Sequence, residues 1–278
     1  MAFPTCSRSA LLSLVLTSAA FAQITIGSVT HTGISAAPKQ PNPFTQVTIG
    51  AVTNAASFAA DSLSPGSIAT IFGTGLATSV AHAEALPLPM ALGGATVTVN
   101  GIPTPLFYVS PLQINFQIPY EVLIGTASVV VNVAGDSSAP FSAWIQAASP
   151  GIFQFGTNRA VAQNPDNSLN DTNNPVPAGS YIVAYLTGMG PMDNPVADGV
   201  AAPATPLSTA TSLFSATIGG QNAHIFFLGL TPGSVGLAQA NITIPPLPAG
   251  SYLLVITIDG VPSNAALVTV SDTLSSAR

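Results

Sequence analysis

The stretch PGSIATIFGTGL, from Pro65 to Leu76, and its counterpart AGSYIVAYLTGMG, from Ala178 to Gly190, decide the fold of this chain. Each begins at a turn of small residues and continues as a run of apolar residues too short for a helix, which favours a buried strand. Each also opens a series of segments that follow one another in the same order. A repeat of this kind predicts that one fold occurs twice along the chain.

The later segments of the two series agree in type, order and approximate spacing. They pair as follows: ATVTVNG (Ala95 to Gly101) with ATIGG (Ala216 to Gly220), QINFQIP (Gln113 to Pro119) with QANITIP (Gln239 to Pro245), and GTASVVVNV (Gly125 to Val133) with GSYLLVITI (Gly250 to Ile258). Polar and apolar residues alternate in these segments with the period of half-buried strands. Two-residue turns that need positive φ are expected at Asn100-Gly101 and Gly219-Gly220, with last hairpins at Gly135-Asp136 and Asp259-Gly260. Short strands without strand–helix alternation predict antiparallel sandwiches.

The N-terminus is typical of a secretory signal peptide. Arg8 precedes the apolar run from Ala10 to Ala20, and Ala20-Phe21-Ala22 fits the cleavage pattern, so the mature chain is expected to start at Gln23. An uncleaved anchor is the alternative. Export of the Sec type would place the protein outside the cell or on its surface, with the periplasm as the alternative. No span is predicted in the mature chain.

Charge excludes two classes of partner. Only 5% of the residues are charged, against about 25% in an average soluble protein. The mature chain keeps three basic residues, Lys39, Arg159 and Arg278, against ten acids. This composition lacks the basic surface of a nucleic-acid binder and argues against electrostatic binding to anionic lipid. The only cysteine, Cys6, lies in the predicted signal peptide, so no disulfide is expected.

Several segments resemble a known family. They are VTNAASF (Val52 to Phe58), the long segment from Leu86 to Val122, ASPGIF (Ala148 to Phe153) and AVAQNPDNSLN (Ala160 to Asn170). Together they resemble the Solibacter uncharacterised C-terminal domain family of secreted acidobacterial proteins. The strand PGSIATIFGTGL is also similar, over a shorter length, to the start of IPT/TIG immunoglobulin-like domains. The resemblance implies a fold and an extracellular address, and it implies no biochemical activity.

The resulting fold prediction is an all-β chain with two tandem immunoglobulin-like antiparallel β-sandwich domains. The predicted organisation is a signal peptide (1–22), a leader strand with a Pro-rich linker (23–46), a first domain (47–150) and a second domain (151–278). The segment RAVAQ, from Arg159 to Gln163, is expected to be the first strand of the second domain.

Catalytic motifs are missing from the sequence. A nucleophile elbow would need G-x-S-x-G, which does not occur. The histidines, His31, His82 and His224, have no second His or Cys at ligand spacing, so no zinc site is predicted. His224 lies in an expected strand from Asn222 to Leu228. The acidic residues are scattered singly, mostly at turns. We therefore predict that the protein is not an enzyme; the alternative is an extracellular hydrolase, which would need two carboxylates within about 10 Å of each other.

One polar segment has the spacing of a cation-binding loop. Asn164, Asp166, Ser168 and Asn170 recur at every second position, and Asp171 follows directly. Oxygen ligands at alternate positions suit calcium, but the glycine and the terminal Glu of an EF-hand are missing. A structural calcium ion is one interpretation, and a loop of Asx turns is the other. No other cofactor is predicted.

Two aromatic residues are candidates for ligand binding. Tyr120 and Trp144 are the expected exposed members of a set of aromatics that otherwise favours core packing. The predicted function is a non-catalytic secreted or cell-surface module for adhesion, matrix assembly or partner binding. Its partner would be an extracellular protein or a polysaccharide; a carbohydrate-binding module is an alternative, predicting exposed aromatics on one sheet face. The paired amides, Gln113 with Asn115 and Gln239 with Asn241, are expected to hydrogen-bond across the sheet or cap edge strands.

Overall fold

The computed structural model describes residues 46–60 and 62–272. The predicted signal peptide, and the leader up to residue 45, lie outside the described residues. Within the described ranges every regular element is a strand. No helix in this part of the chain has the length and apolar character needed to cross a membrane.

The N-terminal sheet pair is built entirely from residues 48–145. One of its sheets has the order β1 (Thr48–Asn54), β2 (Ile68–Thr74), β7 (Gln113–Gln117), β6 (Leu106–Val109), β3 (Ala81–His82). The facing sheet has the order β10 (Phe141–Ile145), β8 (Gly125–Val133), β4 (Ala95–Val99), β5 (Ile102–Pro103), and β9 (Asp136–Ser137) pairs with β8.

The C-terminal sheet pair is built from residues 151–271. One sheet has the order β11 (Gly151–Ile152), β16 (Tyr181–Thr187), β20 (Ala238–Thr243), β19 (Ile225–Leu230), and β14 (Ala162–Gln163) pairs with β16. The other has the order β12 (Gln154–Phe155), β13 (Arg159–Ala160), β23 (Ala266–Ser271), β21 (Gly250–Ile258), β17 (Phe214–Ile218), β18 (Gln221–Ala223); β15 (Val176–Pro177) pairs with β23 and β22 (Val261–Pro262) with β21.

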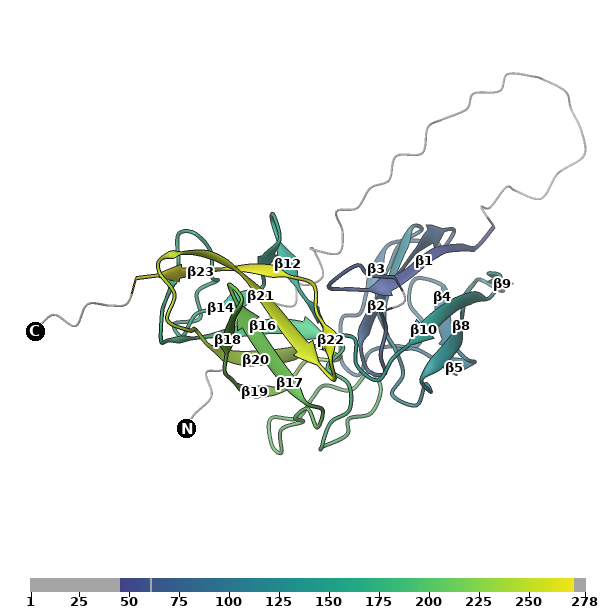
Figure 1. The fold of residues 1–278 in the computed structure, drawn as a ribbon. Helices are drawn as coiled ribbons and strands as arrows, with labels where there is room; N and C mark the ends of the chain where they lie inside the picture. Colours follow the sequence, from purple (N-terminus) through teal and green to yellow (C-terminus); the bar gives the residue numbers. More distant parts are fainter. Residues whose placement is uncertain (1–45, 61, 273–278) are drawn as a thin grey trace, which may run out of the picture.

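Strand order makes both pairs immunoglobulin-like. An immunoglobulin sandwich has strands A, B, E and D in one sheet and C, F and G in the other. The orders β1-β2-β7-β6 and β11-β16-β20-β19 correspond to A-B-E-D, and β4-β8-β10 and β17-β21-β23 correspond to C-F-G. The prediction of an all-β, immunoglobulin-like antiparallel sandwich is confirmed (Figure 1).

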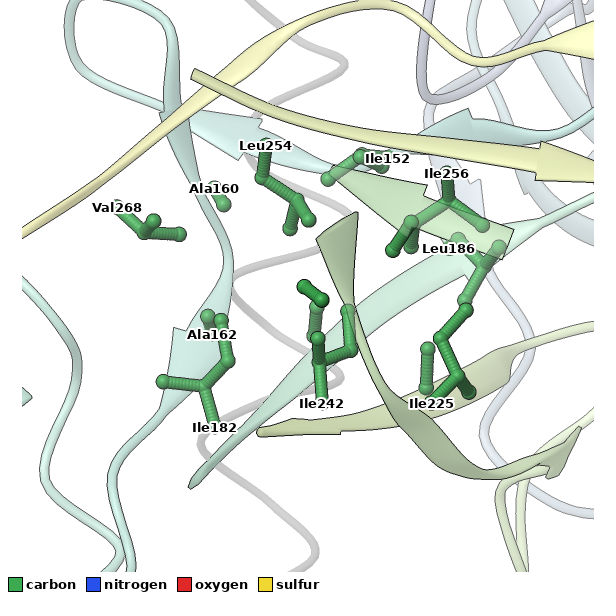
Figure 2. Packing of buried hydrophobic residues seen from close by; sticks show 14 of the residues in the cluster. Ile152, Ala160, Ala162, Ile182, Leu186, Ile225, Ile242, Leu254, Ile256 and Val268 are labelled. Atoms are coloured by element: carbon green, nitrogen blue, oxygen red, sulfur yellow. The ribbon is translucent and has the colours of Figure 1, made fainter. Parts of the chain in front are cut away.

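Each sheet pair encloses its own apolar core. The larger core cluster draws all its fully buried members from residues 148–270, and the second draws them from residues 47–145. In the first of these clusters Leu254 and Ile256 of one sheet point toward Ile182 and Ile242 of the other (Figure 2). Alternate residues of β8 and β21 are buried, which is why the period-two pattern predicted these strands.

The turn predictions are mostly confirmed. Asn100-Gly101, Gly219-Gly220 and Asp259-Gly260 all have positive φ. The turn of the remaining hairpin lies one residue earlier than expected, at Ala134-Gly135, where φ is positive at both residues.

Two strand predictions were wrong. The first strand of the C-terminal pair is Gly151–Ile152, and the segment from Arg159 to Gln163 divides between β13 and β14, which join different sheets. A strand was also expected from Asn222 to Leu228, but it breaks at His224, where the chain passes from one sheet to the other.

Candidate functional site

The paired amides lie at equivalent positions of β7 and β20. Gln113 Nε2 donates to Asn115 Oδ1 at 2.9 Å, and Gln239 Nε2 donates to Asn241 Oδ1 at 3.2 Å. These two bonds run along one strand and do not cross the sheet. One bond does cross to the neighbouring strand, from Thr70 Oγ1 to Asn115 Oδ1 at 3.0 Å. The repeat therefore reproduces a side-chain hydrogen bond as well as a strand order.

A second repeated detail is a bulge beside these amides. The register of β6 shifts between Leu106 and Tyr108, and that of β19 shifts between Ile225 and Phe227. A bulge places an extra residue on one strand, so consecutive side chains can leave the sheet on the same side. Phe107 and Tyr108 accordingly pack in a cluster outside the sandwich core. The equivalent pair is Phe226 and Phe227.

This outer cluster forms the interface between the two sheet pairs, which lie side by side in Figure 1. Its buried members come from both pairs: Ala55, Ala56, Ile68, Leu88, Phe107, Phe153, Val161, Tyr185, Val235 and Leu237. Hydrogen bonds surround it. Ile68 N donates to Thr187 Oγ1 at 2.8 Å, and Gly199 N donates to Gln117 Oε1 at 2.7 Å. Apolar burial and directional bonds together make this internal interface a defined contact.

Tyr120, a predicted ligand residue, lies at the internal interface and is largely buried. Its ring packs against Gly66, where a Cβ atom would come within 2.0 Å of Tyr120 Cε1. Its backbone N donates to Asp198 Oδ1 at 3.0 Å. Burial raises the pKa of the Tyr120 phenol, and the Asp198 carboxylate raises it further. The cavity beside the ring holds about 10 Å³, room for a single water molecule.

Two carboxylates interact at the same place. Partial burial raises the pKa of Asp198, a hydrogen bond from Tyr120 N opposes this, and the nearby charge of Glu121 raises it further. Asp198 thus serves as an acceptor that joins the sheet pairs. The cavity beside the Tyr120 ring, which neither carboxylate lines, has no room for a sugar substrate.

Trp144, the other predicted ligand residue, is 47% exposed on strand β10. It pairs with Thr126, next to the exposed Leu123 and Ile124. Three exposed apolar residues therefore lie near the start of β8 and the end of β10. Trp144 and Tyr120 do not share one sheet face.

The Asn- and Asp-rich loop uses its side chains within the protein. Asp166 Oδ1 accepts from Ser168 N and Ser168 Oγ, at 3.0 and 2.6 Å. Asn170 Nδ2 donates to Asn164 Oδ1 and Thr269 O, and Asn170 Oδ1 accepts from Thr269 N at 2.7 Å.

Asp171 Oδ1 accepts from Asn173 N and Asn174 N, at 2.7 and 2.8 Å. These hydrogen bonds lower the pKa of Asp171, as those of Ser168 lower the pKa of Asp166. Among the described residues no three His, Cys, Asp or Glu side chains gather closely enough to hold a metal ion. The bonding pattern is that of an Asx-turn loop fixed to β23.

An open groove lies at one end of the C-terminal sheet pair. It holds about 420 Å³ and has mostly apolar walls formed by Ala178, Gly179, Asn222, His224, Thr243, Ile244, Pro245 and Pro246. Beside it the rings of Tyr181 and Phe226 meet edge to face, with centroids 5.7 Å apart. Sequence reasoning missed this groove, although its position follows from the repeated turns before β2 and β16.

The fold and these surfaces define an all-β protein with two immunoglobulin-like sheet pairs and an apolar groove. No protein-family model and no curated protein matches the chain. A solved structure of SGBP-B, from the mixed-linkage glucan utilization locus of Bacteroides ovatus and in complex with a mixed-linkage heptasaccharide, is similar at 19% identity. Its TM-score is 0.35, over 77% of this chain and 44% of that one.

Two further structures are similar at lower scores. The Escherichia coli adhesin FdeC is 15% identical, with a TM-score of 0.25, over 82% of this chain and 63% of that one. The gamma-CGTase of alkalophilic Bacillus clarkii is 13% identical, with a TM-score of 0.28, over 82% of this chain and 27% of that one. The chain spans less than half the length of SGBP-B and of the CGTase. At these scores the similarities carry no statement about function.

Proposed function

We propose that this chain is a non-catalytic, secreted or cell-surface module that binds a protein partner at the groove of its C-terminal sheet pair. The observation that carries the proposal is the groove of about 420 Å³ beside the edge-to-face pair of Tyr181 and Phe226. Exposed aromatic and apolar side chains around a concave surface are typical of interaction sites. Its walls present aliphatic side chains, prolines and backbone, which suits adhesion or assembly.

The chemistry of the groove supports binding over catalysis. Its only titratable lining side chain is His224, and a hydrolase of the predicted kind needs a pair of carboxylates. The charge of Glu121 raises the pKa of Asp198, but the Asp198 carboxylate already accepts a hydrogen bond from Tyr120 N. The cavity beside the Tyr120 ring admits about one water.

The proposal includes the domain organisation expected from the sequence. Residues 47–150 and 151–278 are two domains that follow an exported leader. Separate apolar cores within the two halves support this division. The internal interface holds the two domains in one orientation, so the groove is presented at a fixed position.

Retention of the purified chain on cell-envelope fractions of the source organism tests the proposal. Phe226→Asp places a charge beside the groove and is expected to reduce retention at least about 10-fold. Leu213→Asp is the matched control, because Leu213 is also exposed and does not line the groove. Equal retention of wild type and Phe226→Asp would contradict the proposal.

A second candidate function is carbohydrate binding at Trp144. The exposed indole is suited to stacking on a sugar ring. Binding to insoluble polysaccharides that is lost in Trp144→Ala and kept in Phe226→Asp would support this second site. Binding that is equal in wild type and Trp144→Ala would exclude it.

A further inference from the structure

The turn at Gly179, which lines the groove, makes the same backbone hydrogen bond as the turn at Gly66, which lies at the internal interface. Gly66 N donates to Ile118 O at 2.9 Å, and Gly179 N donates to Ile244 O at 3.0 Å. Gly66 faces the C-terminal sheet pair, whereas Gly179 and Ile244 line the groove. The same backbone arrangement is therefore covered in one sheet pair and open in the other.

The neighbouring strand ends agree as well. Gln117 N donates to Pro105 O at 2.9 Å, and Thr243 N donates to His224 O at 2.9 Å. Gly199 of the C-terminal pair contacts both Gln117 and Pro105: its N–H donates to Gln117 Oε1, and a Cβ added to it would come within 3.2 Å of Pro105. Thr243 and His224 instead line the groove. The groove thus corresponds to the place that Gly199 fills in the N-terminal pair.

The aromatic pair beside the groove, Tyr181 and Phe226, follows the same pattern. Ile68 and Phe107 are buried at the internal interface. Tyr181 and Phe226 hold the equivalent positions of β16 and β19, and Phe226 is 50% exposed.

The surface of the C-terminal pair that covers the N-terminal pair has an equivalent on the N-terminal pair itself. Tyr185, buried at the internal interface, pairs with Gln239 in the sheet, and Phe72 pairs with Gln113 in the same register. Phe72 is only half-buried and contacts the exposed Phe58, with ring centroids 6.4 Å apart.

Two further residues complete this surface. Thr74 ends β2 as Thr187 ends β16, and Thr187 Oγ1 accepts the bond from Ile68 N. Leu112 is 61% exposed beside them. We call the surface made by Phe58, Phe72, Thr74 and Leu112 the base of the N-terminal pair.

We propose that the groove binds the base of a second copy of this chain, so that copies associate head to tail through a contact that repeats the internal interface. The inference rests on the proposed function and names its partner. Groove and base are different surfaces, so the contact is heterologous and leaves one groove and one base free at the ends of every assembly. Copies can therefore add successively into a chain.

Sedimentation velocity of the purified protein tests the inference. Protein concentrations should reach about 1 mM, because the short segment that joins the two sheet pairs within one chain gives them an effective concentration of that order at the internal interface. Wild type is expected to sediment faster as its concentration rises. Phe226→Asp blocks the groove and Leu112→Asp blocks the base, and each is expected to weaken association about 30-fold or more. Leu213→Asp, the control, is expected to behave as wild type.

Mixing the two blocked variants gives the decisive result. Phe226→Asp retains a base and Leu112→Asp retains a groove, so an equimolar mixture is expected to form a dimer and nothing larger. Circular dichroism and thermal melts of both variants establish that they are folded. A wild type that stays monomeric, or a Phe226→Asp variant that associates as well as wild type, would overturn the inference. If wild type is monomeric but its retention on envelope material still depends on Phe226, the proposed function stands with a different partner.

Discussion

Phe107 and Phe226 occupy the same position in the two sheet pairs, yet Phe107 is 6% exposed and Phe226 is 50% exposed. Each phenylalanine is the first of two consecutive aromatic residues at a β-bulge. The strand beside each bulge carries a Gln-x-Asn pair. Only Phe107 is covered by the other sheet pair. This difference links the internal interface to the groove and leads to predictions about stability.

Replacement of the two phenylalanines should have unequal effects. Phe107→Ala removes a buried ring from the internal interface and is expected to lower the free energy of unfolding by about 3 kcal/mol. Phe226→Ala removes a half-exposed ring and is expected to cost about 1 kcal/mol or less. Denaturation in urea measures both. Equal losses would contradict the assignment of Phe107 to a packed interface.

Asn170 should be essential to the Asx-rich loop. Its side chain is fully buried and bonds both backbone groups of Thr269. Asn170→Ala leaves the Thr269 N–H without its side-chain acceptor and is expected to cost about 1–3 kcal/mol. Asn173→Ala, in the exposed part of the loop, is the control and is expected to cost less than about 0.5 kcal/mol. A loss in Asn170→Ala no larger than that of the control would count against this role.

Calcium should leave the melting temperature unchanged. Asp166 and Asp171 already accept hydrogen bonds from Ser168 and from the backbone of the loop. A ligand that binds only the folded state would raise Tm with its concentration. Thermal melts in excess calcium and in excess chelator are therefore expected to coincide. A rise in Tm that disappears in Asp166→Asn would instead support the calcium interpretation.

Stability should fall at alkaline pH because of Tyr120. Burial and the nearby Asp198 raise the pKa of its phenol, so the folded protein retains a proton that the unfolded chain releases above about pH 10. This stability contribution is complete below pH 10 and is lost as pH rises further. Urea unfolding at pH 8 and 11 is expected to show a smaller loss for Tyr120→Phe than for wild type. The control Tyr252→Phe is expected to lose as much stability as wild type between these pH values. An equally large loss in Tyr120→Phe would contradict the prediction.

Much of the fold was predictable because its signals are local. The repeat marks the segments Gly125–Val133 and Gly250–Ile258, which coincide with β8 and β21, and alternation in their later residues indicates strands. The order of the repeat predicts equivalent strands, and Asn100-Gly101 predicts a hairpin turn that needs positive φ. Each signal depends on the covalent neighbours of a residue.

The binding surfaces were harder to predict because they depend on contacts between distant residues. A simple alternation would place Phe107 and Tyr108 on opposite faces, and the bulge brings both to one face. Tyr120 was expected to be exposed, but Asp198, 78 positions along the chain, binds its backbone at the internal interface. The sequence pattern gives no sign of this bond. The groove becomes apparent only when the turn at Gly179 is compared with the turn at Gly66, which the internal interface covers.

Site-directed cross-linking between two copies tests the central claim most directly. In chains carrying Cys6→Ser, one copy has Thr74→Cys in the base and the other has Asn222→Cys in the groove. With a short bis-maleimide, the mixture is expected to give a covalent dimer containing one copy of each, well above the yield from either chain alone. A yield no higher than that from Thr74→Cys mixed with Leu213→Cys would contradict head-to-tail binding at the groove.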